Sequence, residues 1–156
     1  MVKVLFVCLG NICRSPMAEA LFKEKIAKKG LEDKITSDSA GTGDYHIGAQ
    51  PDPRTLDTLK KNGIRFQHEA RQANSSDADQ FDYILAMDIS NFDDLKKLYP
   101  ADYKNLYLMR EFDEIDKGAN VPDPYFGGVD GFDQVYEILD RTLDRFIEKI
   151  RMDHNI

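Results

Sequence analysis

The chain of 156 residues has two cysteines and no tryptophan. Two cysteines are too few for the disulfide framework of a small secreted protein. They are also too few for a structural zinc site unless histidines contribute, and His46, His68 and His154 show no paired ligand spacing. The sequence therefore predicts neither a metal nor a cofactor.

Long apolar runs and an excess of positive charge are also absent. No stretch approaches the roughly 20 apolar residues that a membrane-spanning helix needs, and the N-terminal apolar run is too short for a secretory leader. The formal net charge of −7 argues against nucleic acid or an anionic membrane as a partner. We therefore expect a cytoplasmic protein that begins at Met1 and folds as one domain over residues 1–156.

The stretch from Val2 to Leu21 is the most informative part of the chain. An apolar run, Val2 to Val7, ends at Cys8, and a short loop containing glycine and asparagine follows. Ser15 is a preferred helix cap, and Pro16 suits the first turn, where a missing N–H costs little. The pattern predicts a strand, a tight loop and the start of a helix.

This arrangement favours an anion site with a reactive thiol. Successive loop N–H groups can form an anion-binding nest, and the helix dipole adds positive potential there. Arg14 supplies a planar fork that matches two phosphate oxygens. In such surroundings Cys8, at the end of the strand, is expected to be a thiolate aimed at the central atom of a tetrahedral oxyanion.

The rest of the chain alternates strands and helices. Further strands are expected near residues 35–40, 83–87 and 106–109. Helices are expected after Ser15, after Asp52 and after Ser90, which is predicted to be a cap, with a short helix starting near 74–77 and a long one over 132–150. Alternating elements with continuous apolar strands indicate an α/β fold with a parallel sheet and helices on both faces.

Several motifs occur together and identify a family. They are C-L-G-N-I-C-R-S-P-M-A-E from Cys8, D-S-A-G-T at Asp38–Thr42, P-D-P-R at Pro51–Arg54, H-E-A-R-Q at His68–Gln72, F-D-Y-I-L-A-M-D at Phe81–Asp88 and P-D-P-Y at Pro122–Tyr125. In these motifs the chain resembles the low-molecular-weight protein tyrosine phosphatase family from Val2 to about Ile150. The resemblance implies a four-stranded parallel sheet with helices on both faces, the phosphotyrosine phosphatase I-like, Rossmann-like three-layer fold.

The resemblance also implies the role of each site residue. Cys8 is the expected nucleophile, Arg14 the expected phosphate ligand and Asp123 the expected general acid and base. Ser15 is expected to donate to the Cys8 thiolate. Asn11, which tolerates left-handed backbone, is expected to hold the loop in shape with Ser39 and His68. The remaining phosphate contacts are assigned to the main-chain N–H groups of the loop, which comprises Leu9, Gly10, Asn11, Ile12, Cys13, Arg14 and Ser15.

Two features bear on the substrate. Tyr45, Tyr125 and Phe126 match the aromatic walls that enclose a phenyl phosphate in this family. Members that act on phosphoarginine carry threonine where this chain has Ile12, and tyrosine phosphatases carry a bulkier aliphatic residue. The resemblance therefore implies a phosphotyrosine-containing protein as the partner, with a cognate tyrosine kinase as one candidate.

Several assignments keep an alternative. Asp123 between two prolines is also a typical turn residue, and the three aromatic residues are also consistent with loop packing. Cys13 matches a second loop cysteine that can form a reversible disulfide with Cys8, but a neighbouring thiol also serves simply as packing. Asp88 is interpreted as a helix start outside the active site, and His46 and His154 as solvated surface.

Three other functions compete with a tyrosine phosphatase. A protein-arginine phosphatase of the same family is the nearest. A thiol-coupled arsenate reductase shares the fold, but such enzymes use two further cysteines outside the loop, and this chain has only Cys8 and Cys13. A non-catalytic phosphoprotein-binding module is disfavoured because Cys8, Arg14 and Asp123 are all present.

Overall fold

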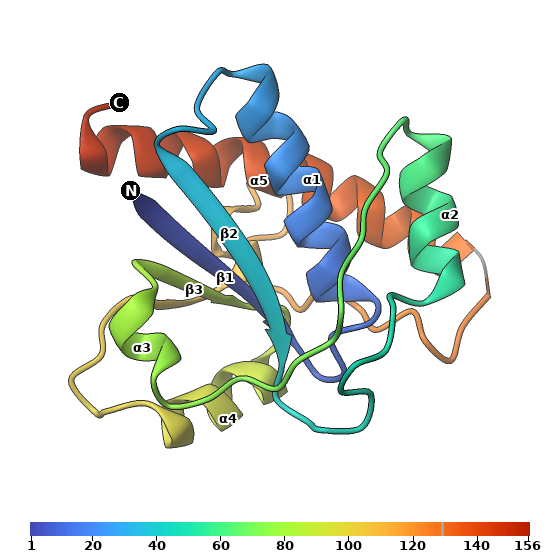
Figure 1. Cartoon of the computed structure of the whole chain (residues 1–156), viewed down its shortest axis with the longest axis horizontal. Coiled ribbons are helices and arrows are strands. Elements are labelled where there is room, and N and C mark those ends of the chain that lie inside the picture. The colour runs from blue at the N-terminus through green and yellow to red at the C-terminus, as the bar shows by residue number, and fades with distance from the viewer. Residues whose placement is uncertain (129) are drawn as a thin grey trace.

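The computed structural model describes residues 1–128 and 130–156. Its centre is a four-stranded sheet in the order β2-β1-β3-β4, and every pair of neighbouring strands is parallel. Helices lie on both faces of this sheet (Figure 1). The predicted fold class is therefore confirmed. The strands are β1 (Val2–Cys8), β2 (Ile35–Gly41), β3 (Tyr83–Ala86) and β4 (Leu106–Leu108).

The helices form two layers. On one face, α1 (Arg14–Lys28) and α5 (Asp130–His154) cover the sheet, and α2 (Pro53–Lys61) packs against both of them. On the other face lie α3 (Asp77–Gln80) and α4 (Ile89–Leu98), below the strands in Figure 1. A short 3₁₀ helix, η1 (Met109–Phe112), follows β4 and contacts α5.

The strand β1 is buried on both faces, which explains its nearly continuous apolar sequence. Val4 and Phe6 pack into the core under α1 and α5, whereas Leu5 and Val7 pack into the core under α4. Phe6 contacts Phe22 and Phe146 edge-on, with ring centroids 5.3 and 6.5 Å apart. This packing fixes the strand whose last residue is Cys8.

Two helix starts differ from the sequence prediction. The helix α1 begins at Arg14 rather than after a Ser15 cap: Cys13 is the cap residue, without a side-chain cap hydrogen bond, and the Ser15 hydroxyl contacts Cys8. The cap of α4 is Asp88 rather than Ser90, since Asp88 has extended backbone and its Oδ1 accepts from the N–H of Asn91 at 2.8 Å. The predicted cap of α2, Asp52, is confirmed.

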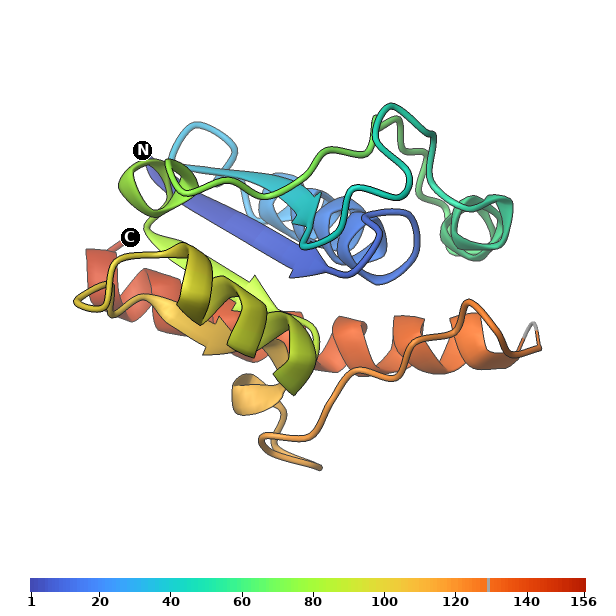
Figure 2. The same cartoon turned by 90° about the horizontal axis from the view of Figure 1, so that it is seen from below.

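The carboxyl ends of the strands bring several of the motif-bearing loops to one edge of the sheet. The arrowheads of β1 and β2 point to the same end of the molecule in Figure 2, and Cys8 pairs in register with Gly41 there. In parallel α/β sheets this edge is where ligands bind. None of the described helices is long and apolar enough to span a membrane.

Candidate active site

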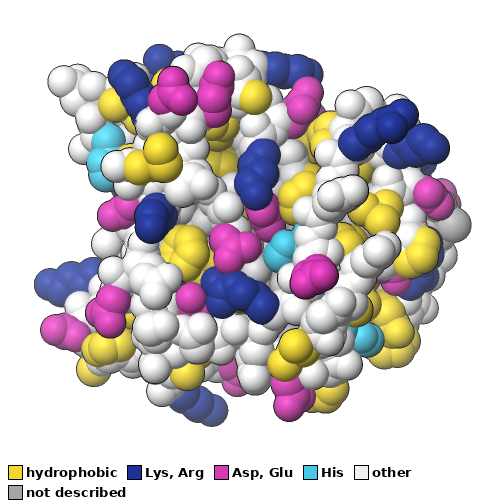
Figure 3. Space-filling model, viewed as in Figure 1, with side chains coloured by type: hydrophobic (Ala, Val, Ile, Leu, Met, Phe, Trp, Pro, Cys, Tyr) yellow, Lys and Arg dark blue, Asp and Glu magenta, His cyan; other side chains and the backbone are white. Residues whose placement is uncertain are grey.

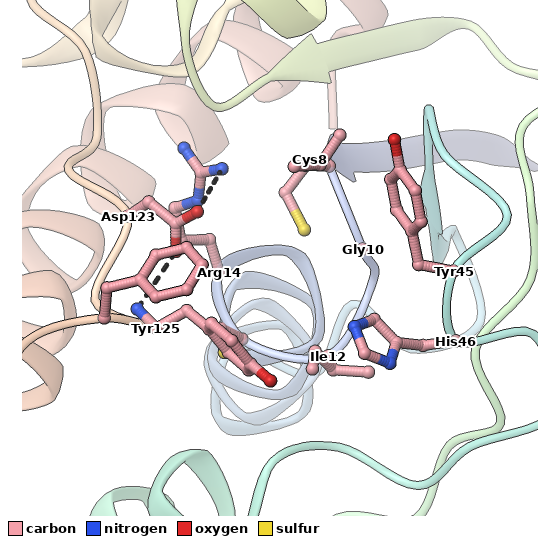
Figure 4. Close-up of a pocket in the computed structure, with 11 residues that line it drawn as sticks. Cys8, Gly10, Ile12, Arg14, Tyr45, His46, Asp123 and Tyr125 are labelled. Carbon is pink, nitrogen blue, oxygen red and sulfur yellow. Dashed lines mark hydrogen bonds and ion pairs between the residues drawn. The ribbon is translucent and has the colours of Figure 1, made fainter.

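A cavity of about 330 Å³ opens at this edge. Figure 4 shows the Cys8 sulfur pointing into it, with Asp123 and Arg14 on one side and Tyr45 and His46 on the other. Its lining comes from the end of β1, the start of α1 and two loops that are distant in sequence. The lining residues are Cys8, Leu9, Gly10, Ile12, Cys13, Arg14, Tyr45, His46, Asp123, Tyr125 and Phe126.

The loop after β1 folds around the sulfur of Cys8. The main-chain N–H of Asn11 donates to Cys8 Sγ at 3.3 Å, and Ser15 Oγ lies 3.0 Å from the same sulfur. Asn11 has a positive φ of 58°, which only a few residue types adopt readily. The left-handed turn directs the loop N–H toward the thiol, so the predicted role of an asparagine here has a physical basis.

The Asn11 side chain is fully engaged in hydrogen bonds. Its Nδ2 donates to Ser15 Oγ at 2.8 Å and to Ser39 Oγ at 3.0 Å. Its Oδ1 accepts from His68 Nε2 at 2.8 Å and from the main-chain N–H of Arg71 at 3.0 Å. Since a carboxamide has two donors and two acceptor positions, the buried group is satisfied. Ser39 and His68 therefore bind the Asn11 side chain, as the family resemblance implies, and the main chain of Arg71 is an additional partner.

Arg14 is buried beside the thiol, with its side chain 3% exposed. Its Nη1 donates to Asp88 Oδ2 at 2.6 Å and to the Val121 carbonyl at 3.0 Å, and its Nη2 lies 3.6 Å from Asp123 Oδ2. Burial opposes the positive charge, but Cys8 and Asp88 outweigh it and hold the pKa of Arg14 above its usual value. The guanidinium is therefore a fixed cation in the wall of the cavity.

Asp123 lies in the loop between η1 and α5, at the rim of the cavity. Its Oδ1 accepts from the main-chain N–H of Tyr125 at 3.1 Å, so the residue does form a turn, and its side chain is 37% exposed. The other carboxylate oxygen faces Arg14. The turn interpretation and the cavity position are thus compatible, because the turn holds the carboxylate over the anion site (Figure 4).

Aromatic side chains line the mouth of the cavity. Tyr45 is 72% exposed and Phe126 is 92% exposed, so neither packs in the core. Tyr125 contacts Phe126 edge-on, with ring centroids 4.8 Å apart. The guanidinium of Arg54 lies over the Tyr125 ring and donates to the Tyr125 carbonyl at 3.1 Å. Arg54 is thus a support for this wall that sequence reasoning missed.

The assignment of His46 to solvated surface is wrong. His46 lies in the wall of the cavity, 6.3 Å from Tyr125 between ring centroids. A Cβ added at Gly10 would lie 3.0 Å from His46 Cδ2, so a side chain there would push against the imidazole. The sequence feature that indicates this position is the neighbouring Tyr45, which the family resemblance assigns to the aromatic wall of the cavity.

The exclusion of Asp88 from the site is also wrong, although its identification as a helix start is correct. One of its oxygens caps α4 and the other binds Arg14. Asp88 follows the buried strand β3 at the carboxyl edge of the sheet, which was the signal available in the sequence. The assignment of His154 to the surface fits its exposure, although its Nε2 contacts the Tyr83 hydroxyl at 3.1 Å.

Cys13 differs from Cys8 in its surroundings. Both thiols are free and buried. Burial, followed by the charge of Asp52, raises the pKa of Cys13 to about 12. Cys13 is therefore a neutral thiol at physiological pH.

Within the described part of the chain, one group of side chains has metal-ligand spacing. Ligand atoms of Glu19, Asp38 and His68 all lie within 4.8 Å of one another. Glu19 is already paired with Lys23 and accepts from Ser39 Oγ at 2.7 Å, and Asp38 accepts from Arg71 Nε at 2.9 Å. Cations and hydroxyls of the protein thus occupy these oxygens, and we assign no metal to them.

Comparison with known proteins agrees with this geometry. The family model of the low molecular weight phosphotyrosine protein phosphatases matches residues 3–155. The chain belongs to this family. A low molecular weight phosphotyrosine protein phosphatase from Schizosaccharomyces pombe is 48% identical over 96% of this chain and 97% of its own length.

Solved structures of family members have the same fold. A protein tyrosine phosphatase from Entamoeba histolytica is 42% identical and superimposes with a TM-score of 0.93 over 99% of both chains. A Drosophila arginine phosphatase is 35% identical, with a TM-score of 0.87 over 96% of this chain and 98% of its own. The family fold thus accommodates both activities that these names describe.

Proposed function

We propose that this member of the family hydrolyses phosphotyrosine and other aryl phosphates through a cysteinyl-phosphate intermediate. The observation that carries the proposal is the shared cavity of Cys8, Arg14 and Asp123, a sulfur, a fixed cation and a carboxyl group. The chain needs no cofactor for this chemistry. Its partner is a phosphotyrosine-containing protein, and a tyrosine kinase is the class of enzyme that supplies such a substrate.

In the first step the Cys8 sulfur attacks phosphorus. A P–S bond forms and the P–O bond to the phenol breaks, so that the electron pair goes to the phenolic oxygen. Asp123 donates the proton that this oxygen takes up, which makes the phenol a better leaving group. Arg14 and the loop N–H groups hold the three equatorial oxygens, whose charge must be stabilised in the transition state.

In the second step water attacks the phosphocysteine. The Asp123 carboxylate takes a proton from the water, a P–O bond forms and the P–S bond breaks. Inorganic phosphate leaves, and Cys8 returns as the thiolate. The Asn11 N–H and the Ser15 hydroxyl, at 3.3 and 3.0 Å from the sulfur, support that thiolate as a leaving group.

The walls of the cavity favour a flat aromatic group above the phosphate. Tyr45, Tyr125 and Phe126 offer exposed ring surface at the mouth, which suits the phenyl ring of phosphotyrosine. Ile12 lies in the lining between the loop and this mouth. Its branched aliphatic side chain adds apolar contact and offers no hydrogen bond to a guanidinium.

A protein-arginine phosphatase is the second candidate, favoured by the similarity to the Drosophila arginine phosphatase. We would compare kcat/KM for matched peptides that carry phosphotyrosine or phosphoarginine, using the wild type and Ile12→Thr. The proposal predicts preference for phosphotyrosine in the wild type and a shift toward phosphoarginine in the variant. A wild-type preference for phosphoarginine would replace the proposed substrate class.

The nucleophile is tested with Cys8→Ser and the matched control Cys13→Ser on p-nitrophenyl phosphate. The proposal predicts that Cys8→Ser abolishes turnover, because a neutral hydroxyl is a much weaker nucleophile than a thiolate. Cys13→Ser is expected to retain most activity, because the phosphate contact expected at this position is made by the main-chain N–H, which serine keeps, and the buried Cys13 thiol takes no part in the reaction. Full activity of Cys8→Ser would rule out the mechanism.

A further inference from the structure

Arg71 connects two parts of the site through its main chain. Its N–H donates to Asn11 Oδ1 at 3.0 Å, and its carbonyl accepts from the N–H of Gly41, the last residue of β2, at 2.9 Å. The next residue, Gln72, pairs with Gly41 as an isolated parallel bridge. The backbone at residue 71 therefore holds both the end of a strand and the side chain that shapes the phosphate loop.

The Arg71 side chain is clamped by two aspartates from different elements. Its Nε donates to Asp38 Oδ2 at 2.9 Å, and its Nη1 and Nη2 donate to Asp77 Oδ2 and Oδ1 at 3.3 and 3.2 Å. Asp77, at the start of α3, is 3% exposed and also accepts from the N–H of Asn74 at 2.9 Å. The planar guanidinium bridges β2 and α3, which a lysine ammonium cannot do in the same geometry.

The Arg71 guanidinium stays positively charged between the two aspartates. Burial disfavours the Arg71 cation, but the hydrogen bonds and charges of Asp77 and Asp38 outweigh burial and raise the pKa of Arg71 above its usual value. Arg71 therefore remains a cation beside the two aspartates. Because the Arg71 side chain is only 30% exposed, solvent screens these pairs less than ordinary surface pairs.

Asn11 depends on such an anchor. It is buried in a left-handed conformation, which asparagine adopts more readily than most residues, and its buried carboxamide needs hydrogen-bond partners. Three of its side-chain partners, Ser15, Ser39 and His68, are side-chain groups that can rotate. The fourth partner is the main-chain N–H of Arg71, which is held by the bond between the Arg71 carbonyl and Gly41 and, through the side chain, by the clamp.

We propose that Arg71 is a positioning residue for the phosphate loop. Its ion pairs with Asp77 and Asp38 fix its main-chain N–H, which orients the Asn11 carboxamide and thereby the Asn11 N–H that faces the Cys8 sulfur. The loop is thus held in its anion-binding shape before a phosphate arrives. This inference deepens the proposed function and rests on it for the effect on turnover, but not for the effect on anion binding.

The test compares Arg71→Lys with Arg141→Lys. Arg141 binds the buried Asp113 with Nε and Nη2, both at 3.0 Å, and is 34% exposed, so its replacement also removes a guanidinium pair with a buried aspartate. Arg141 lies on α5, outside the cavity lining. Calorimetry with inorganic phosphate measures anion binding, p-nitrophenyl phosphate measures turnover, and thermal unfolding measures stability.

We expect both variants to lose stability, and only Arg71→Lys to weaken phosphate binding and kcat/KM. The loss should be roughly three- to tenfold, which is the effect of one neutral hydrogen bond. In an Asn11→Ala background Arg71→Lys should cause no further loss, because the two residues act through one contact. Equal effects of Arg71→Lys and Arg141→Lys on phosphate binding, or additive losses with Asn11→Ala, would overturn the proposal.

A second variant, Asp38→Asn, keeps the proposal testable if Arg71→Lys does not fold. Asp38 is only half-buried, so Asp38→Asn retains the shape of the side chain and removes the charge of one clamp partner. It should weaken phosphate binding in the same direction, and unchanged binding would overturn the proposal. If the wild type binds phosphate but does not cleave aryl phosphates, the proposed function fails while the binding comparison still decides the role of Arg71.

Discussion

Arg14 Nη1 and Asp88 Oδ2 are 2.6 Å apart at the back of the cavity, and the other Asp88 oxygen caps α4. One carboxylate therefore ties the cation of the phosphate site to a helix on the far side of the sheet. Since Val121 also accepts from Nη1, the guanidinium has little freedom to rotate. Its Nη2 remains on the side of Asp123, toward the cavity.

Replacing Asp88 should weaken catalysis without removing any reacting group. Asp88→Asn keeps a good helix cap but loses the negative charge that orients Arg14. Hydrogen bonds to charged groups are worth about 1.5–3 kcal/mol, so kcat/KM for p-nitrophenyl phosphate should fall roughly 10- to 150-fold. Steady-state kinetics measure this directly, and wild-type kcat/KM in the variant would contradict the orienting role of Asp88.

Replacing Asp123 should slow turnover in a way that depends on the leaving group. We expect Asp123→Asn to reduce kcat/KM, which reports the step in which the phenol leaves, by about 10²–10⁴ for phenyl phosphate and by less for p-nitrophenyl phosphate, because p-nitrophenolate leaves without a proton. The matched control is Asp116→Asn, an exposed aspartate of the same loop that pairs with Arg110 at 3.6 Å. The same loss for both leaving groups would argue against general acid catalysis by Asp123.

The buried Cys13 thiol predicts a pH dependence of stability. Burial and Asp52 raise its pKa from 9.0 to about 12, so between these values the folded chain holds a proton that the unfolded chain has lost. Stability must therefore fall as pH rises above about 9, by about 1.4 kcal/mol per pH unit for this one group. Urea unfolding of the wild type and Cys13→Ala should show this extra slope only in the wild type. Parallel curves from pH 8 to 10.5 would contradict it.

The sequence predicted the part of the site that is local in the chain. Cys8 and Arg14 belong to one strand, loop and helix, whose hydrophobic pattern and turn residues carry the information. The parallel sheet could likewise be predicted, because β1 and β3 are nearly continuous apolar runs and the strands alternate with helices. Asp123 depended on the resemblance to a family, since the sequence around it indicates only a turn.

The site residues that could not be predicted from the sequence are placed there by contacts between distant segments of the chain. Asp88 and Arg71 are polar residues near a helix start or in a loop, and only the folded chain brings them to Arg14 and Asn11. The prediction of a Ser15 cap is wrong for the same reason, because the Ser15 hydroxyl contacts the Cys8 thiol, at the end of β1, instead of capping its own helix. Local propensity is a weak guide where a tertiary partner competes for the same group.

The central claim is that phosphate is transferred to the Cys8 sulfur. The direct measurement is acid quenching of the Asp123→Asn variant during turnover of p-nitrophenyl phosphate, followed by mass spectrometry of its peptides. Without the carboxylate that activates water, the intermediate should persist, and the account predicts one phosphate on the peptide that contains Cys8. Release of p-nitrophenol with no phosphate on that peptide, or with phosphate on another residue, would contradict it.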